Sequence, residues 1–342
     1  MSGASLAQRL LYRLAEEPVE RGTTSGFVSG AKLSETLGIT RSAVWKAALR
    51  LRELGVEIEG LPRQGYRLTV PCTPLSADAL RSALSPATQS RLHELRVQWH
   101  TGSTNADLLA SPPPRDRLSV CLAEHQSAGR GRRGRSWLAA PGSALCLSWA
   151  WRFDALPAHI GSLGLAIGIA AASTLRAFGA QSVGLKWPND LVTPDGKLAG
   201  ILIELVSESG GPALVVVGLG LNVALGVGLR EAVRADGNRA TDLASSGARS
   251  VDRNVLAARL VDDGVEAMLR WERDGFAPLI PAWRELDRLH GQPVVVRHVD
   301  RSLEGIARGV DIDGALLLDD GGTVHRLNSG EASVRRLEAV TP

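Results

Sequence analysis

The sequence predicts a multidomain α/β (α+β) protein with three parts in order along the chain. Leucines at helical spacing open the chain, apolar strands alternate with long helices in its middle, and short strands between turns close it. With 342 residues the chain is also longer than one typical hydrophobic core requires. We therefore expect a winged helix-turn-helix at residues 1–70, a mixed-sheet domain at 75–290 and an SH3-like β-barrel at 291–342.

The composition excludes several protein classes. Apolar residues make up 44% of the chain and charged residues 22%, which is typical of a globular protein. The three cysteines form no CxxC pair and the seven histidines no HExxH pair, so neither a disulfide framework nor a protein-ligated metal cluster is expected. Free cysteines fit a reducing cytoplasm. Acidic residues among positions 1–25 are not typical of a secretory signal. The uncharged apolar run 160–175 is too short for a membrane span and is predicted to be a buried helix.

The first seventy residues carry the signals of a helix-turn-helix. A helical repeat predicts a first helix at Leu6, Leu10, Leu11 and Leu14. Ser29 is placed to cap a second helix that ends at Leu37 before Gly38, and Thr40 to cap a third over 41–54. Alternating segments around the turn 62–65 predict a hairpin, the wing. The residues expected to contact DNA are Arg41, Ser42, Lys46 and Arg63. The alternative is a small helical domain with a solvated basic face.

Strands and helices alternate in the middle of the chain, and short strands follow it. Apolar runs predict strands at 118–123, 144–151, 198–206 and 214–220, and helices at 160–178 and 254–274. Beyond residue 292, turn signals separate five short strands, which are expected at 294–299, 306–310, 315–318, 324–327 and 334–337.

An arginine-rich loop, GRGRRGR at 129–135, matches the dinucleotide-binding pattern GxGxxG in letters only. Polar residues 124–127 precede it and no helix begins inside it, so we exclude a Rossmann fold. Glycines allow close backbone approach, and guanidinium groups bind phosphate or carboxylate in bidentate fashion. The loop therefore predicts an anion site. A nuclear-targeting run or a nonspecific nucleic-acid patch is the alternative.

Two of the four lysines in the chain lie in one apolar stretch. Lys186 opens KWPND at 186–190, and Lys197 opens KLAG at 197–200. Lysines beside an aspartate in apolar surroundings favour a site for a substrate anion, whereas the alternative is a surface Lys–Asp pair. GLGLN at 218–222 ends an apolar run and is a weak ligand signal. Taken alone, Ser103-Thr104-Asn105 favours a helix cap over a polar clamp.

Together these motifs resemble the biotin protein ligases. The resemblance rests on Ser103-Thr104-Asn105, on Gln126 with the 129–135 loop, and on KWPND, KLAG and GLGLN in order. With the helix-turn-helix in front and the β-barrel behind, the chain resembles the bifunctional bacterial form, which is also the biotin operon repressor. The resemblance implies a biotin–[acetyl-CoA-carboxylase] ligase. In such an enzyme, biotin and ATP form biotinyl-5′-AMP, which then reacts with a lysine of the biotin carboxyl carrier protein.

The resemblance also implies roles for individual residues. The catalytic residues would be Lys197, Arg132 and Asp190, with Lys197 bridging biotin's carboxylate and the α-phosphate. The biotin-binding residues would be Ser103, Thr104, Asn105, Gln126, Gly129, Arg130, Gly131, Arg132, Lys197, Gly200 and Gly218. The ATP-binding residues would be Arg132, Arg135, Lys186, Asn189 and Asn222. The implied cofactors are ATP and Mg²⁺, with no protein metal cluster.

The resemblance extends to partners and leaves two alternatives open. The implied partners are the carrier protein, operator DNA and, when the adenylate is bound, a second copy of the chain. A biotin-sensing transcription factor without ligase activity and a lipoate or octanoate ligase are the alternatives. In the repressor form a large aromatic residue packs on adenine after the GLGLN-like strand, whereas the stretch 235–241 has none. Two alternatives follow: adenine stacks on Arg239 instead, or the loop orders differently.

Overall fold

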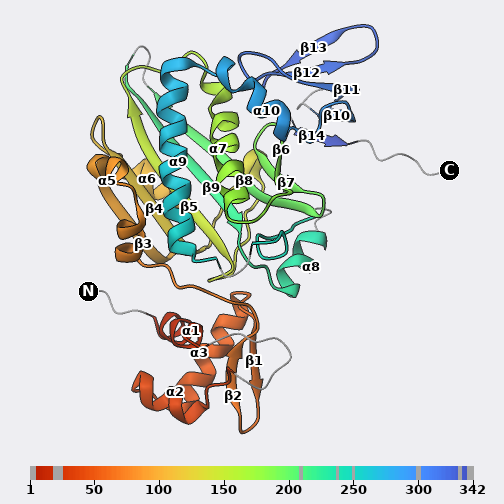
Figure 1. Cartoon of the computed structure of the whole chain (residues 1–342). Helices are drawn as coiled ribbons and strands as arrows, with labels where there is room; N and C mark the ends of the chain where they lie inside the picture. Colours follow the sequence, from red (N-terminus) through yellow and green to blue (C-terminus); the bar gives the residue numbers. More distant parts are fainter. Residues whose placement is uncertain are drawn as a thin grey trace, which may run out of the picture.

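The computed structural model describes residues 5–17, 26–207, 211–235, 239–248, 251–297, 302–329 and 333–336. The chain runs from a winged helix at its N-terminus, through a central α/β layer structure, to a small C-terminal sheet (Figure 1). The N-terminal elements are α1 (Leu6–Ala15), α2 (Gly30–Leu37), α3 (Arg41–Glu53), β1 (Ile58–Leu61) and β2 (Gly65–Leu68).

The N-terminal helices begin and end where the sequence places their caps. The Ser29 side chain accepts a hydrogen bond from the Lys32 amide, and the Thr40 side chain accepts one from the Ala43 amide. Gly38 adopts φ 64°, the left-handed conformation that a glycine permits at a helix end. The apolar sides of the helices share a core that includes Leu10, Leu33, Val44 and Leu51. The helix-turn-helix and its hairpin are thus confirmed.

A mixed sheet of seven strands forms the centre of the part of the chain that the structure describes, in the order β3-β4-β5-β9-β8-β7-β6. Its strands are β3 (Leu92–Thr101), β4 (Leu118–Gln126), β5 (Ala144–Phe153), β6 (Gly184–Lys186), β7 (Asp190–Thr193), β8 (Gly196–Ser207) and β9 (Ala213–Asn222). β3 and β4 are parallel, and the other neighbours are antiparallel.

Helices cover both faces of this sheet. The central helices are α4 (Ala77–Ala83), α5 (Pro86–Arg91), α6 (Thr104–Ala110), α7 (Leu163–Ala177), α8 (Val227–Ala235), α9 (Arg253–Asp274) and α10 (Ile280–Leu286). α7 and α9 pack together over one face, where Trp149, Val217 and Trp271 join the main core (Figure 1). α6 covers the other face, where Leu108 packs on Cys121, Ala150 and Val216. Successive side chains of a strand point to opposite faces of the sheet. A central strand therefore contributes side chains both to the core under α7 and α9 and to the core under α6.

One segment among the described residues, Ile160–Ala177, is long and apolar enough to cross a membrane by length and composition. It contains α7, and 56% of it is buried inside the protein. This matches the buried helix that the sequence predicts at 160–175.

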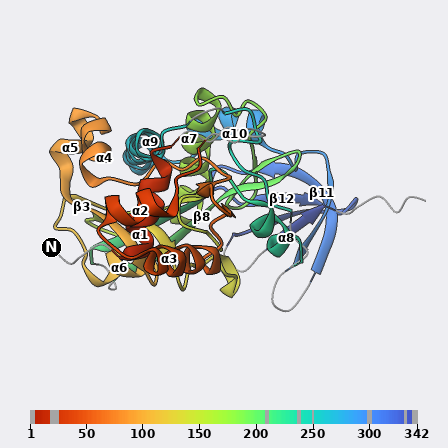
Figure 2. The ribbon, with the colours of Figure 1, turned by 90° about the horizontal axis from the view of Figure 1, so that it is seen from below.

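The C-terminal part is an antiparallel sheet of short strands, as the barrel prediction requires. Its strands are β10 (Pro293–Arg297), β11 (Ser302–Val310), β12 (Leu316–Asp319), β13 (Val324–Leu327) and β14 (Ser333–Arg336). They pair in the order β13-β12-β11-β10-β14. The predicted ends at 298–299 and 337 lie outside the described residues. Seen from the side of the winged helix, β11 and β12 lie to one side of α1–α3, beyond α8 (Figure 2).

The structure corrects two sequence interpretations. Strand β4 continues to Gln126, beyond the predicted end at residue 123, so the polar residues 124–126 belong to the strand. Rossmann geometry is still excluded, because a short 3₁₀ turn at Arg132–Gly134 follows in place of a long helix. The edge strand β3 was not predicted, since its polar and apolar residues mix without a clean period of two.

Candidate functional site

Small residues on three neighbouring strands open a pocket on the α6 face of the central sheet. Ser148 of β5, Gly218 of β9 and Leu202 of β8 lie in one row across the strands. Cys146, Gly220 and Gly200 form the next row. A Cβ on Gly218 would lie 2.4 Å from Asn105 Oδ1, and one on Gly220 would lie 2.5 Å from the Trp137 ring. Only glycine therefore lets Asn105 and Trp137 pack against this floor.

Polar side chains from α6 and β4 form one wall of the pocket. Ser103 stands at the first position before α6, but its side chain makes no cap hydrogen bond, so the cap interpretation is wrong. Instead the Thr104 amide donates to Gln126 Oε1 at 2.8 Å. The Thr104 and Ser148 hydroxyls are 2.7 Å apart, and Ser148 donates to Asn105 Oδ1 at 2.6 Å. These buried groups are ordered by one another, which fixes the shape of the wall.

The arginine loop at 129–135 contributes Arg130, Gly131 and Arg132 to the lining of the pocket. The Trp137 amide donates to the Gly129 carbonyl at 2.9 Å, and this closes the neck of the loop. Arg132 donates to Asn189 Oδ1 at 3.3 Å and to the Ser329 carbonyl of the C-terminal sheet. Arg130 forms an ion pair with Glu204. The loop is therefore held both by the central sheet and by the C-terminal part.

Positive charge gathers around one carboxylate beside the loop. Lys197 Nζ lies 2.5 Å from Asp190 Oδ1. Burial lowers the pKa of Lys186, and burial likewise lowers the pKa of Arg132, while the Asp190 carboxylate opposes the shift in both. The single negative charge of Asp190 does not balance the three positive charges of Lys197, Lys186 and Arg132. An anionic ligand would therefore be stabilised here. This arrangement favours the anion site over the simple surface pair.

The segment after β9 returns alongside Lys197. The Lys197 amide donates to the Arg239 carbonyl at 2.8 Å, and the Thr241 amide donates to the Lys197 carbonyl at 2.9 Å. Asn222 donates to the Thr241 carbonyl at 3.0 Å. Of the stretch that lacks the aromatic residue, 236–238 lie outside the described residues, and Arg239 is exposed. Adenine stacking on Arg239 stays a prediction.

Most of the predicted ligand-binding residues line this one pocket, whose cavity volume is about 60 Å³. Those that line it are Ser103, Thr104, Asn105, Gln126, Arg130, Gly131, Arg132, Asn189, Lys197, Gly200 and Gly218. Those outside the lining are Gly129, at the loop neck, Asp190, which contacts Lys197, and Arg135, Lys186 and Asn222.

The sequence interpretation missed several lining residues. They are Trp137, Cys146, Leu147, Ser148, Ile201, Leu202 and Leu219. Strand alternation from Gly218 across to β5 could have found Cys146 and Ser148, because both share the glycine face. Burial raises the pKa of Cys146 to about 12, so its thiol is a neutral lining group.

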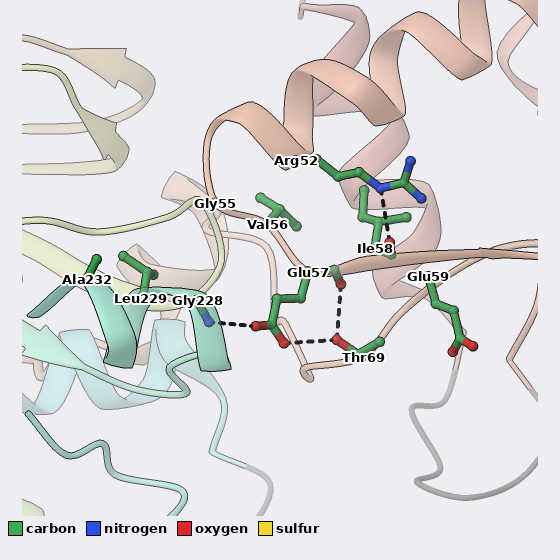
Figure 3. Close-up of a pocket in the computed structure, with 10 residues that line it drawn as sticks. All are labelled: Arg52, Gly55, Val56, Glu57, Ile58, Glu59, Thr69, Gly228, Leu229 and Ala232. Atoms are coloured by element: carbon green, nitrogen blue, oxygen red, sulfur yellow. Dashed lines mark hydrogen bonds between the residues drawn. The ribbon is translucent and has the colours of Figure 1, made fainter. Parts of the chain in front are cut away.

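A second hollow lies between the winged helix and α8, and no predicted ligand-binding residue lines it (Figure 3). Glu57 accepts hydrogen bonds there from the Gly228 amide at 3.2 Å and from the Thr69 hydroxyl at 3.2 Å. Glu57 thus joins the hairpin to the start of α8. The predicted DNA-contacting residues Arg41, Ser42, Lys46 and Arg63 are all exposed.

Among the described residues there is no group of three or more His, Cys, Asp or Glu side chains that could hold a metal ion. Asp190 and Asn189 are the oxygen donors beside the cationic cluster. Mg²⁺ is commonly held by one or two carboxylates together with substrate phosphates. The residues present therefore fit a metal that arrives with a nucleotide.

Comparison with known proteins identifies the three parts of the chain. Residues 22–67 match an HTH domain, residues 97–222 the biotin/lipoate A/B protein ligase family, and residues 289–335 the biotin protein ligase C terminal domain. The bifunctional ligase/repressor BirA of Escherichia coli is 38% identical over 91% of this chain and 94% of its own. A biotin–[acetyl-CoA-carboxylase] ligase of Mycobacterium tuberculosis is 37% identical over 75% of this chain and 95% of its own.

Solved structures agree at the level of the fold. A biotin protein ligase from Aquifex aeolicus in complex with biotin and ATP has a TM-score of 0.60 at 24% identity, covering 72% of this chain and 99% of that one. Fold and pocket together define a protein ligase of the biotin and lipoate class. With its extended match to the bifunctional relatives, the chain belongs to the biotin protein ligase family, in the form that carries an HTH domain.

Proposed function

We propose that this protein joins biotin to a lysine of the biotin carboxyl carrier protein of acetyl-CoA carboxylase. A carboxylate oxygen of biotin attacks the α-phosphorus of ATP, an O–P bond forms and pyrophosphate leaves. The lysine amine then attacks the acyl carbon of biotinyl-5′-AMP, the amide forms, AMP leaves and the amine loses a proton. One observation carries the proposal: Lys197 and Arg132 line the same pocket as the polar wall of Ser103, Thr104 and Gln126.

Biotin has an apolar body and a polar ureido ring, so a pocket with few convergent polar groups suits it. Ser103, Thr104, Asn105 and Gln126 are proposed to hydrogen-bond the ureido end. Gly200 and Gly218 are proposed to bring their backbone close to the ligand, and residues 129–132 to cover it. The loop then excludes water from the adenylate, whose mixed anhydride hydrolyses readily.

Lys197 is proposed to bridge biotin's carboxylate and the α-phosphate. Fixed cations aimed at developing charge stabilise a transition state without reorganisation. Arg132 assists from the loop, and Asp190 positions the Lys197 ammonium. Lys186, Asn189, Asn222 and Arg135 are assigned to the nucleotide side. Mg²⁺, held by Asp190 and Asn189 with the phosphates, would neutralise charge on the leaving pyrophosphate.

The test is a reconstitution with purified components. Biotin, ATP and a carrier domain are incubated with the protein, and the carrier is analysed by intact mass and peptide sequencing. The expected result is one biotin on one lysine, with one pyrophosphate released per biotin. Lipoate in place of biotin is expected to give little product. Binding of biotin without pyrophosphate release would contradict the ligase and favour a sensor.

We also propose that the winged helix binds operator DNA as a homodimer when the adenylate is bound. Adenylate orders the 129–135 loop, which favours pairing of two copies whose α3 helices reach successive half-sites. The contact of Glu57 with the Gly228 amide supports communication between the two parts, because α8 follows the strand that carries Asn222. A cytoplasmic location accords with both the carrier and the DNA and stays a prediction.

Replacing Arg41 and Lys46 together by alanine is expected to weaken DNA binding while ligation is unchanged. Both side chains are exposed on α3, and each lost phosphate contact lowers the slope of log K against log salt by about one. The measurement is a gel-shift titration at several salt concentrations, with and without biotin plus ATP. Arg270→Ala, an exposed arginine of α9, is the control. An unchanged slope would contradict the assignment of Arg41 and Lys46 to phosphate contacts. Equal DNA affinity with and without the adenylate would contradict the coupling between adenylate binding and DNA binding.

A further inference from the structure

Glu204 of β8 joins the pocket floor to the arginine loop through a single oxygen atom. Its Oε2 accepts a hydrogen bond from Asn105 Nδ2 at 2.8 Å and one from Arg130 Nη2 at 3.0 Å. Asn105 is on α6 and Arg130 is on the loop, so Glu204 is the meeting point of three separate segments. The Glu204 side chain is only 22% exposed, against 46% for Arg130.

The contact with Asn105 orients a buried amide. Asn105 is 4% exposed, and its Oδ1 accepts from the Ser148 hydroxyl at 2.6 Å. Its Nδ2 donates to Glu204 and, at a longer 3.4 Å, to the Leu202 carbonyl. A buried amide hydrogen without an acceptor is costly, so Glu204 fixes which way the Asn105 amide faces. The polar wall from Gln126 to Asn105 thus ends on the Glu204 carboxylate.

The contact with Arg130 ties down one side of the loop. On the other side, Arg132 reaches Asn189 and Ser329, and Arg133 reaches the Arg297 carbonyl at 3.3 Å. Arg130 reaches the central sheet at Glu204 instead. A loop held at two separated points is restricted in opening far more than a loop held at one, because both contacts must break.

We propose that Glu204 is a positioning residue that latches the arginine loop over the biotin pocket and sets the orientation of Asn105. The inference rests on the proposed function, since the loop and Asn105 are assigned there to biotin. Glu204 acts on the affinity for biotin and on retention of the adenylate. It does not act on formation of the phosphorus–oxygen bond, which is assigned to Lys197 and Arg132.

The alternative is a surface ion pair of little consequence, and the chain offers a matched control for it. Arg308 and Asp319 pair at 2.7 Å in the C-terminal sheet, with side-chain exposures of 51% and 25%, close to those of Arg130 and Glu204. Neither lines the pocket. The variants Glu204→Gln and Asp319→Asn remove the same charge from two Arg–carboxylate pairs of similar exposure.

The experiment compares steady-state biotinylation of a carrier domain and release of biotinyl-AMP when no carrier is present. Glu204→Gln keeps the side-chain shape and an acceptor for Asn105 but loses the charge that binds Arg130. We expect its KM for biotin to rise about fivefold, the upper range for a partly exposed pair, with kcat within twofold. Adenylate release is expected to accelerate by a similar factor. Asp319→Asn is expected to match the wild type in all three quantities.

A second variant separates the two contacts. Glu204→Ala also leaves the buried Asn105 amide without its acceptor, and we expect a further rise of roughly tenfold in the KM for biotin. In this background, Arg130→Gln is expected to change the KM for biotin and adenylate release by a smaller factor than it does in the wild type, because the contact with Glu204 is already gone. Urea unfolding of each variant verifies that the protein is folded.

Two results would overturn the latch. One is a Glu204→Gln protein whose KM and adenylate release equal those of the Asp319→Asn control. The other is a fall in kcat with an unchanged KM, which would place Glu204 in the chemistry. The proposed function fails separately: in that case the wild-type protein itself forms no adenylate and transfers no biotin.

Discussion

Lys197→Ala is expected to slow adenylate formation by about a thousandfold, the upper range for loss of one preorganised group that stabilises transition-state charge. Lys197 Nζ lies 2.5 Å from Asp190 and lines the pocket beside Gly200. A Cβ on residue 200 would lie 2.9 Å from Nζ, so glycine at this position leaves the space that the ammonium occupies. Without it, the biotin carboxylate and the α-phosphate repel each other at the point where they must join.

The measurement is the single-turnover rate of pyrophosphate release with biotin and ATP. Lys32→Ala, which removes an exposed lysine of α2, is the control and is expected to react at the wild-type rate. Because the Lys197 side chain is 35% exposed and outside the core, the unfolding midpoint of Lys197→Ala is expected to change little. A rate within twofold of wild type would contradict the role of Lys197 in adenylate formation. Arg132 would then be the main cation that stabilises the charge at the α-phosphate.

Local sequence signals predicted the winged helix and the short C-terminal strands well. The caps Ser29 and Thr40 and the left-handed Gly38 act within a few residues, so the sequence alone specifies them. The loop at 129–135 was recognised from its own letters. Its location at the pocket was predicted only through the family resemblance, because the contacts that hold it, with Asn189, Ser329 and Glu204, lie far along the chain.

The floor of the pocket was only half predictable. The motif GLGLN was only a weak signal by itself, and the structure gives the reason for its first glycine, since no larger residue fits where Asn105 packs against Gly218. Ser148 gave none, because a serine inside an apolar strand has no local reason to face a ligand. Its position follows only from the pairing of β5 with β9, in which Ser148 stands opposite Gly218. Cross-strand register is set by the whole sheet, not by neighbouring residues.

The largest expected loss of stability comes from an ion pair that sequence reading did not detect. Arg253 of α9 and Glu124 of β4 are 129 residues apart in the chain, yet their side chains are 1% and 0% exposed and pair at 2.8 Å. Glu124 also accepts from the Leu75 amide at 2.9 Å and the Gly142 amide at 3.1 Å. Arg253 donates to the Ala144 carbonyl at 2.9 Å. The pair therefore links helix α9 and the segment at Leu75, where the central domain begins, to strand β4 of the sheet.

Arg253→Met is expected to lower the free energy of unfolding by about 3–5 kcal/mol, because it leaves the Glu124 carboxylate buried without a counter-charge. The measurement is urea denaturation followed by tryptophan fluorescence. Arg259→Met makes the same change on the same helix at a side chain that is 62% exposed, and is expected to cost less than about 0.5 kcal/mol.

The sign of a second substitution distinguishes a buried charge from simple loss of packing. Adding Glu124→Gln to Arg253→Met removes the unpaired charge and keeps an acceptor for the Leu75 amide, so part of the lost stability is expected to return. Loss of packing alone predicts the opposite, since the second change then adds its own cost. A double variant less stable than Arg253→Met would show that packing around the guanidinium, and not its charge, is what the central domain requires.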